Sequence, residues 1–136
     1  MNIEKFSRIL PPVTDFNRQY WDGCAVGELR LQACSKCKEY WFPEGPCCPR
    51  CLSTEFIWQA VSGRGTIWSH IRMHQKYIAA YEDEVPYTVI MVKLAEGPRM
   101  YSALAEGSPE PRVGSPVSVE FVAIGDRVIP KFRVVE

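Results

Sequence analysis

Four cysteines, arranged as two pairs, constrain what this 136-residue chain can fold into more than any other feature. Cys34 and Cys37 are separated by two residues, and Cys48 and Cys51 repeat that spacing further along the chain. A Cys-x-x-Cys turn directs two thiolates to one point, and two such turns supply the four soft ligands of a closed tetrahedral zinc site. The spacing therefore predicts a zinc ribbon with about one zinc ion per chain.

Two disulfides are the alternative use of the same four cysteines, and they require an oxidising compartment. The first residues, MNIEKFSRILPPV, show no long apolar run behind a basic start, and no stretch reaches the roughly 20 apolar residues of a membrane span. We therefore expect a cytoplasmic chain that binds a metal and no membrane. A rubredoxin-type iron site, which would make the chain a redox carrier, stays open as an alternative to zinc.

Two further cysteines lie outside the predicted site. Cys47 directly precedes Cys48, but its use with Cys51 would break the two-residue spacing, so Cys48 is the better ligand. Cys24 precedes the ribbon, where a free cysteine commonly serves as a small buried apolar residue. Neither Cys24 nor Cys47 has an activating partner nearby in the sequence, and a nucleophilic role stays an open alternative for both.

The composition describes one modest folded core: 46% of the residues are hydrophobic and 24% are charged. Sixteen Lys and Arg balance sixteen Asp and Glu, so no overall positive field attracts a polyanion. This balance argues against a nucleic-acid partner. Because zinc ribbons and OB-fold barrels often bind nucleic acids, a nucleic-acid-binding module nevertheless remains the main alternative function.

An amphipathic helix is predicted ahead of the ribbon, over about residues 15–26. Thr14 stands where an N-cap is expected, Asp15 suits the positive end of a helix, and Gly27 suits its end. Its apolar residues recur at helical spacing: Phe16, Tyr20, Trp21 and Cys24. This face is expected to pack on the ribbon, on the following domain or on another protein.

After the ribbon the hydrophobic period changes to two, which indicates strands. The predicted strands cover residues 57–61, 66–74, 87–94, 100–104, 117–124 and 128–135. Short strands joined by Gly- and Pro-rich turns favour a small antiparallel barrel, and the OB-fold fits best. The predicted fold class is mainly β, with a leader and helix in residues 1–30, a rubredoxin-like zinc ribbon in 31–56 and a C-terminal OB-fold domain in 57–136.

One predicted strand, residues 66–74, carries residues suited to ligand binding. Strict alternation places its polar and aromatic side chains on one face: Trp68, His70, Arg72 and His74. Such a face would stack an adenine ring and hold phosphates. A solvated outer face, with Trp68 partly covered by a loop, is the simpler alternative. A second metal site at the two histidines lacks an evident third ligand.

No catalytic constellation is recognisable in the sequence. It contains no G-x-S-x-G elbow, no H-E-x-x-H, no P-loop and no G-x-G-x-x-G after a strand. The acidic residues 82–84 are most simply a solvated loop between two strands. The residues by themselves therefore predict no catalytic group in this chain.

The chain resembles the acyl-CoA-associated family of zinc-ribbon plus OB-fold proteins, long catalogued as a domain of unknown function. The resemblance spans about residues 14–134 and depends on the order of several segments: YWDGCAVGELRLQAC, the double Cys-x-x-Cys, VSGRGTIWSH, VPYTVIMVKLAEGPRM, VGSPVSVEF and IPKFR. It implies an N-terminal helical segment, a rubredoxin-like ribbon and an OB barrel. It also implies that the zinc ligands are Cys34, Cys37, Cys48 and Cys51.

The resemblance implies partners as well, because such proteins are typically small companions of thiolase-fold enzymes. These enzymes include acetyl-CoA acetyltransferases and retro-aldolases that shorten CoA-linked steroid side chains. We therefore expect a free-standing subunit of a hetero-oligomer, favoured to be an aldolase complex, with acyl-CoA near the shared interface and the active site in the partner. An acyl-CoA contact at Arg64, Trp68 and Arg72 is our own inference from side-chain chemistry.

Overall fold

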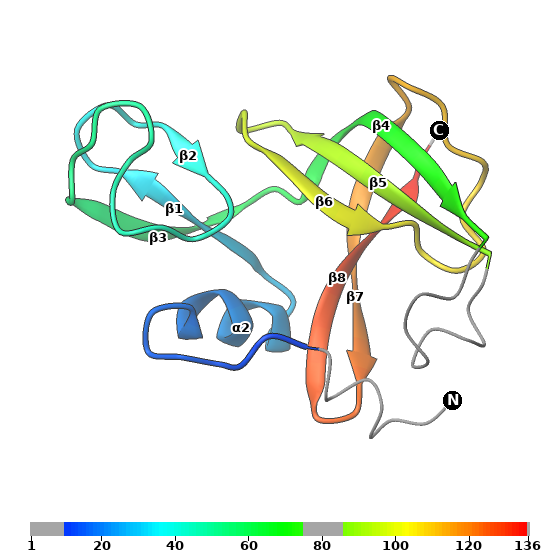
Figure 1. The fold of residues 1–136 in the computed structure, drawn as a ribbon, viewed down its shortest axis with the longest axis horizontal. Helices are drawn as coiled ribbons and strands as arrows, with labels where there is room; N and C mark the ends of the chain where they lie inside the picture. The colour runs from blue at the N-terminus through cyan, green and yellow to red at the C-terminus, as the bar shows by residue number, and fades with distance from the viewer. Residues whose placement is uncertain (1–9, 75–85, 136) are drawn as a thin grey trace.

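The computed structural model describes residues 10–74 and 86–135 of the chain, and these residues form one short helix and two antiparallel sheets (Figure 1). The elements are α2 (Arg18–Ala25), β1 (Leu29–Cys34), β2 (Tyr40–Trp41), β3 (Phe56–Val61), β4 (Arg64–Met73), β5 (Tyr87–Leu94), β6 (Arg99–Ala103), β7 (Pro116–Ile124) and β8 (Arg127–Val134). The predicted mainly β class is confirmed. The predicted acidic loop at 82–84 lies outside the described residues.

The smaller sheet has the strand order β2-β1-β3 and carries the cysteine-rich segment. β1 pairs with β3 along its whole length, from Leu29 opposite Val61 to Cys34 opposite Phe56. The predicted strand at 57–61 therefore belongs to the sheet of the ribbon through its pairing. Its end leads directly into β4, so the two sheets are joined by one continuous piece of chain (Figure 1).

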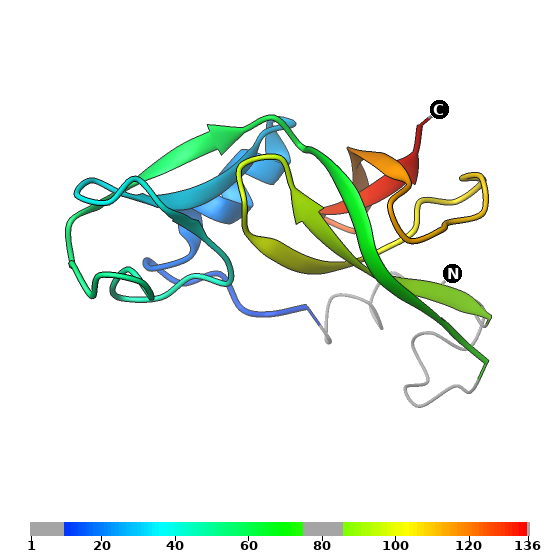
Figure 2. The ribbon, with the colours of Figure 1, turned by 90° about the horizontal axis from the view of Figure 1, so that it is seen from above.

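The larger sheet has the order β6-β5-β4-β7-β8 and curls into a nearly closed barrel, as Figures 1 and 2 show from two directions. A parallel bridge between Leu104 and Phe132 links the chain after β6 to β8 and brings the two edges together. Its interior is built from fully buried side chains: Ile67, Ile90, Val92, Val117 and Phe132. The predicted OB-like barrel is confirmed.

Two glycines make the passage from β3 to β4 possible. Gly63 has a φ of +74°, and a Cβ on it would lie 2.3 Å from Cγ1 of Val119. A Cβ on Gly65 would lie 2.3 Å from the carbonyl oxygen of Lys93 on the neighbouring strand. Real Cβ atoms do not approach other atoms this closely, so glycine is required at both positions.

The helix is shorter than predicted, because Asn17 rather than Thr14 is its N-cap residue. The two residues exchange hydrogen bonds: the Thr14 N–H donates to Oδ1 of Asn17 over 2.7 Å, and the Asn17 N–H donates to the Thr14 hydroxyl over 3.2 Å. These bonds hold a turn ahead of α2, so the predicted N-cap is wrong. Phe16 lies in that turn and is 43% exposed, outside the buried face.

The remaining helix face packs within the chain. Tyr20 and Cys24 are buried, and α2 contacts both β1 of the small sheet and β8 of the barrel (Figure 1). The Tyr20 ring lies 5.7 Å from the Phe42 ring, centroid to centroid. Of the three packing alternatives, the helix therefore uses two at once, the ribbon and the barrel. No helix among the residues that the structure describes is long and apolar enough to cross a membrane.

Candidate functional site

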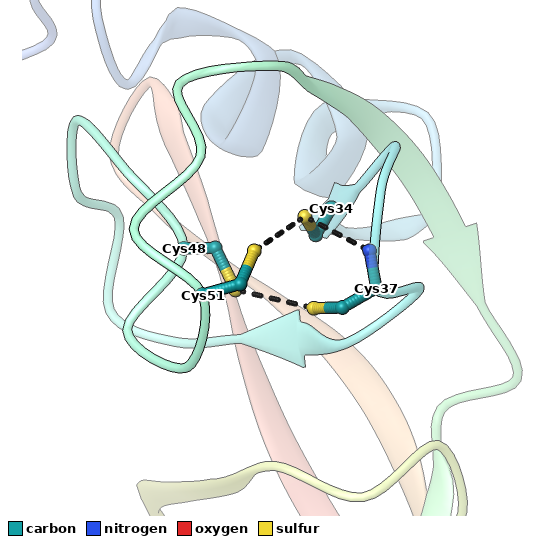
Figure 3. Close-up of side chains that lie close together, drawn as sticks. All are labelled: Cys34, Cys37, Cys48 and Cys51. Atoms are coloured by element: carbon teal, nitrogen blue, oxygen red, sulfur yellow. Dashed lines mark hydrogen bonds between the residues drawn. The ribbon is translucent and has the colours of Figure 1, made fainter.

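The four predicted ligand cysteines come together at the end of the small sheet (Figure 3). Their sulfur atoms all lie within 4.8 Å of one another. The sulfur of Cys34 is 3.5 Å from that of Cys51, and the sulfur of Cys37 is 3.5 Å from that of Cys48. Zinc–sulfur bonds of about 2.3 Å in a tetrahedron place the sulfurs about 3.8 Å apart. The cluster therefore fits one zinc ion.

The two Cys-x-x-Cys turns have the same backbone geometry. The Lys38 N–H donates to the carbonyl of Cys34 over 3.1 Å, and the Leu52 N–H donates to the carbonyl of Cys48 over 2.9 Å. Lys38 and Leu52 both adopt a positive φ, of 66° and 61°. Each turn thus folds back immediately after its second cysteine, and this reversal directs both thiols to one side.

The backbone also favours the thiolate form that binds metal. The N–H of Cys37 lies 3.4 Å from the Cys34 sulfur, and hydrogen bonding from that N–H lowers the pKa of Cys34 to about 6. Burial by itself would raise the pKa of Cys48, but backbone N–H groups of Cys51 and Arg50 outweigh it and lower that pKa. Both turns therefore present donors to a negative sulfur.

Sequence reasoning missed Gln32, which supports the metal site from β1. Its side chain is 1% exposed and bonds Gly45 twice: its Nε2 donates to the Gly45 carbonyl, and its Oε1 accepts from the Gly45 N–H, both over 2.8 Å. This clamp fixes the segment that leads into the second cysteine turn. A glutamine between the apolar residues of the strand LRLQAC was the signal that could have identified it.

The other two cysteines stay away from the metal cluster. Cys24 is fully buried in α2, and burial raises its pKa to about 11, which disfavours the reactive thiolate form. Cys47 is partly buried, and the structure brings its neighbour Cys48 to the cluster instead.

A β-bulge in β4 changes the predicted ligand-binding face. Ile67 pairs with Val92 and Ser69 pairs with Met91, so Trp68 is an extra residue between two consecutive pairs. An extra residue reverses the alternation that follows it.

The predicted common face of Trp68, His70 and Arg72 is therefore wrong. His70 pairs with the buried Ile90 and lies on the core side of the strand, whereas Ile71 is 58% exposed on the outer side. Arg72 follows His70 on the core side, two residues further along the strand.

Arg72 lines a cavity of about 470 Å³ at the end of the barrel. A second cation, Lys131 of β8, also lines it, together with two carboxylates of the loop after β6, Glu106 and Glu110. A cavity of this size accommodates part of a small-molecule ligand.

The structure does not bring Arg64 and Trp68 to this cavity. Arg64 begins β4, and Trp68 lies over Lys93 and Arg99 on the outer side of the sheet. The three residues of the predicted acyl-CoA contact are thus divided between two faces.

An all-cysteine metal ribbon followed by a nearly closed five-stranded barrel defines a zinc-ribbon plus OB-fold protein. Residues 21–56 match the family model described as ChsH2, rubredoxin-like zinc ribbon domain, and residues 58–133 match the model described as ChsH2, C-terminal OB-fold domain. The chain belongs to this ChsH2 family of zinc-ribbon and OB-fold proteins.

Curated relatives of the chain include subunits of CoA hydratases and a scaffold protein. A probable enoyl-CoA hydratase alpha subunit of Thermomonospora curvata is 31% identical over 95% of this chain and 40% of its own length. A DUF35 domain-containing scaffold protein of Methanocaldococcus jannaschii is 30% identical over 57% of this chain and 55% of its own length. The 3-oxo-4,17-pregnadiene-20-carboxyl-CoA hydratase alpha subunit of Mycobacterium tuberculosis is 29% identical over 79% of this chain and 34% of its own length. The chain thus spans only about a third to just over half of these relatives.

A solved structure matches over nearly the whole chain. A chain of the structure entitled "Ltp2-ChsH2(DUF35) aldolase" is 30% identical and superposes with a TM-score of 0.79 over 92% of this chain and 98% of its own. A DUF35-family protein of unknown function from Sulfolobus solfataricus superposes with a TM-score of 0.63 over 97% of this chain and 91% of its own. It is 12% identical and supports the fold alone.

Proposed function

We propose that this chain is a cytoplasmic accessory subunit that binds and stabilises a thiolase-fold enzyme acting on acyl-CoA. A retro-aldolase that cleaves a CoA-linked steroid side chain is the favoured partner, and an acyl- or acetyl-CoA transferase is the second. One observation carries the proposal: the similarity to a chain of an aldolase complex extends over 98% of that chain. The hydratase subunits among the relatives support acyl-CoA as the substrate class.

The donor set of the metal site supports a structural role for the zinc. Four protein thiolates complete a tetrahedral shell and leave no position for a substrate or a water molecule. In this proposal the zinc organises the small sheet, which has little hydrophobic core of its own, and catalysis belongs to the partner. The ribbon and α2 form the principal docking region for the partner.

For the acyl-CoA itself, the proposal retains Arg72 and adds Lys131. Both cations line the same cavity, and guanidinium and ammonium groups bind phosphates or carboxylates. Arg64 and Trp68 lie on the other side of the sheet, so we no longer include them in the same contact.

The test is co-expression with the thiolase-fold protein encoded beside this chain, followed by size exclusion with light scattering and a CoA-thioester turnover assay. We expect the two chains to elute together and the partner to be more active and more stable in the complex. A partner that is equally active and stable alone would overturn the accessory role.

The same turnover assay tests whether the cavity binds the CoA thioester. The double variant Arg72→Ala/Lys131→Ala should raise the KM for the CoA thioester about tenfold or more while the complex stays intact. Arg112→Ala, an exposed cation that does not line the cavity, is the control. An unchanged KM in the double variant would remove the cavity from the proposal and leave the accessory role standing.

A further inference from the structure

The outer face of β4, β5 and β6 is one continuous surface. Its rows are set by strand register: Thr66 lies beside Lys93 and Lys93 beside Arg99, while in the next row Met91 lies beside Tyr101. The residues that alternate with them point to the barrel side, and Ile67, Val92 and Met100 among them are buried. We call the following set the outer face: Arg64, Thr66, Trp68, Ser69, Ile71, Val89, Met91, Lys93, Arg99 and Tyr101.

This outer face exposes large apolar side chains. Trp68 is 48% exposed, Ile71 is 58% exposed and Tyr101 is 69% exposed. A solvated sheet face is usually polar, and aromatic residues together with Arg are enriched at the energetic centres of protein interfaces. Trp68 lies on this side by plain alternation from Thr66, and the bulge in β4 then brings Ile71 to the same side, so a specific backbone irregularity completes the patch.

The charges on the outer face all have one sign. The Arg99 guanidinium carbon lies 5.0 Å from the centroid of the Trp68 ring, and the Lys93 Nζ lies 5.5 Å from it. Within residues 10–74 and 86–135, neither cation has an ion-pair partner. Arg64 adds a third positive charge at the start of β4, and the face contains no Asp or Glu. The patch is therefore apolar and cationic in a chain with no net charge.

We propose that the outer face is a docking surface for a protein whose contacting surface is acidic around an apolar centre. The proposal rests on the proposed function, because it assigns this surface to the thiolase-fold partner, in addition to the ribbon and α2. Carboxylates of the partner would pair with Lys93 and Arg99, and its apolar centre would cover Trp68 and Tyr101. Charge pairs of this kind steer association and fix the register of an interface.

Other occupants fit the outer face less well. A second copy of this chain, docked through the same face, would bring Lys93 and Arg99 against the same cations, since a two-fold interface is self-complementary. A single-stranded nucleic acid needs successive open ring faces for stacking. Here two cations already lie over the Trp68 ring, and the aliphatic Ile71 and Met91 occupy much of the remaining surface.

The experiment measures binding of the full chain to the purified thiolase-fold partner at two salt concentrations. Lys93→Glu/Arg99→Glu should weaken the Kd at least tenfold, with the larger loss at low salt, and Trp68→Ala should weaken it about tenfold through faster dissociation. Arg112→Glu, a single charge reversal in the loop before β7, should leave the Kd unchanged. Zinc content and melting temperature of each variant establish that it is folded.

The outcomes separate this inference from the proposed function. If the wild-type chain fails to bind the partner, both are overturned. If the wild-type chain binds and the outer-face variants bind equally well, only the docking surface is overturned. Concentration-dependent self-association that Arg99→Glu abolishes, or salt-dependent binding of a single-stranded 20-nucleotide DNA probe that the double reversal abolishes, would also overturn it in favour of that occupant.

Discussion

The guanidinium carbon of Arg127 lies 4.2 Å from the centroid of the Trp21 ring. Trp21 belongs to α2, and Arg127 begins β8 directly after the tight turn that follows β7. Nη2 of the same guanidinium donates to the carbonyl oxygen of Pro11 over 2.8 Å. One side chain therefore joins the segment before the helix, the helix itself and the barrel.

Replacing Arg127 should loosen this junction. We expect Arg127→Ala to lower the free energy of unfolding by about 1–2 kcal/mol, because a cation–π contact and a hydrogen bond are lost together. Urea unfolding of the full chain measures the change. Arg112→Ala, an exposed arginine elsewhere, should have almost no effect, and equal stability of the two variants would show that the stacking is incidental.

The metal site can be tested with two adjacent cysteines. Cys48→Ser should release zinc and, with it, partner binding, while the barrel stays at least partly folded. Cys47→Ser should keep about one zinc per chain, because its sulfur is outside the cluster. Metal analysis after gel filtration gives the answer. A Cys48→Ser chain that loses zinc but still supports full complex activity would show that the ribbon is not needed for function.

Gln32 should matter for metal retention although it is not a ligand. Gln32→Met keeps a similar volume but leaves the Gly45 N–H and carbonyl without their partner, at a cost of about 1–3 kcal/mol. We expect the zinc affinity to fall about tenfold in competition with a chromophoric chelator. The control is Gln59→Met on β3, because among the described residues the Gln59 side chain has no such pair of hydrogen bonds. A zinc affinity equal to that of the wild-type chain would contradict the supporting role.

Gly65 in β4 and Gly114 in the turn before β7 should differ in their tolerance of a methyl group. Gly65→Ala brings a Cβ to 2.3 Å from the Lys93 carbonyl oxygen and should destabilise the barrel by several kcal/mol. Gly114→Ala has open space and only the strain of a φ of +91°, so it should cost about 1–2 kcal/mol. Thermal unfolding of both variants compares them, and equal melting temperatures would contradict the contact.

The ion pair between Glu120 and Arg133 predicts a specific dependence of stability on pH. Arg133 donates from Nε and Nη2 to the two carboxylate oxygens, and this hydrogen bonding lowers the pKa of Glu120 below its usual value. A lowered folded-state pKa contributes stability above the unfolded pKa of about 4.3, and that contribution is lost as the pH falls through the folded value.

Glu120→Gln should therefore lower stability slightly near neutral pH, by about 0.2–1 kcal/mol for a partly exposed pair. Below about pH 4.3 the difference from the wild-type chain should shrink. Melting temperatures from pH 7 downward measure the difference. The control is Asp22→Asn, because Asp22 is exposed and has no ion pair among the described residues. A difference that stays constant with pH would show that the carboxylate charge is not its source.

The metal site and the fold class could be predicted because their signals are local. A Cys-x-x-Cys turn closes through bonds within five residues, as the bond from the Leu52 N–H to the Cys48 carbonyl does. Alternation along the strands likewise follows from the backbone itself. The start of the helix was misplaced because Thr14 and Asn17 are both good capping residues by type. The Thr14 hydroxyl accepts from the Asn17 N–H and so closes a turn before α2, which begins only after Asn17.

The faces that His70, Ile71 and Arg72 present were not available to sequence reasoning. One unpaired residue in β4 moves every later side chain to the opposite side, and the bulge arises from how β5 pairs on either side of it. The amino-acid sequence by itself thus determined the zinc ligands, the strands and the barrel, because these depend on spacing and period along the chain. Only the tertiary structure decided which side chains share a surface, because strand register and the packing of α2 between ribbon and barrel are set by contacts between residues distant in sequence.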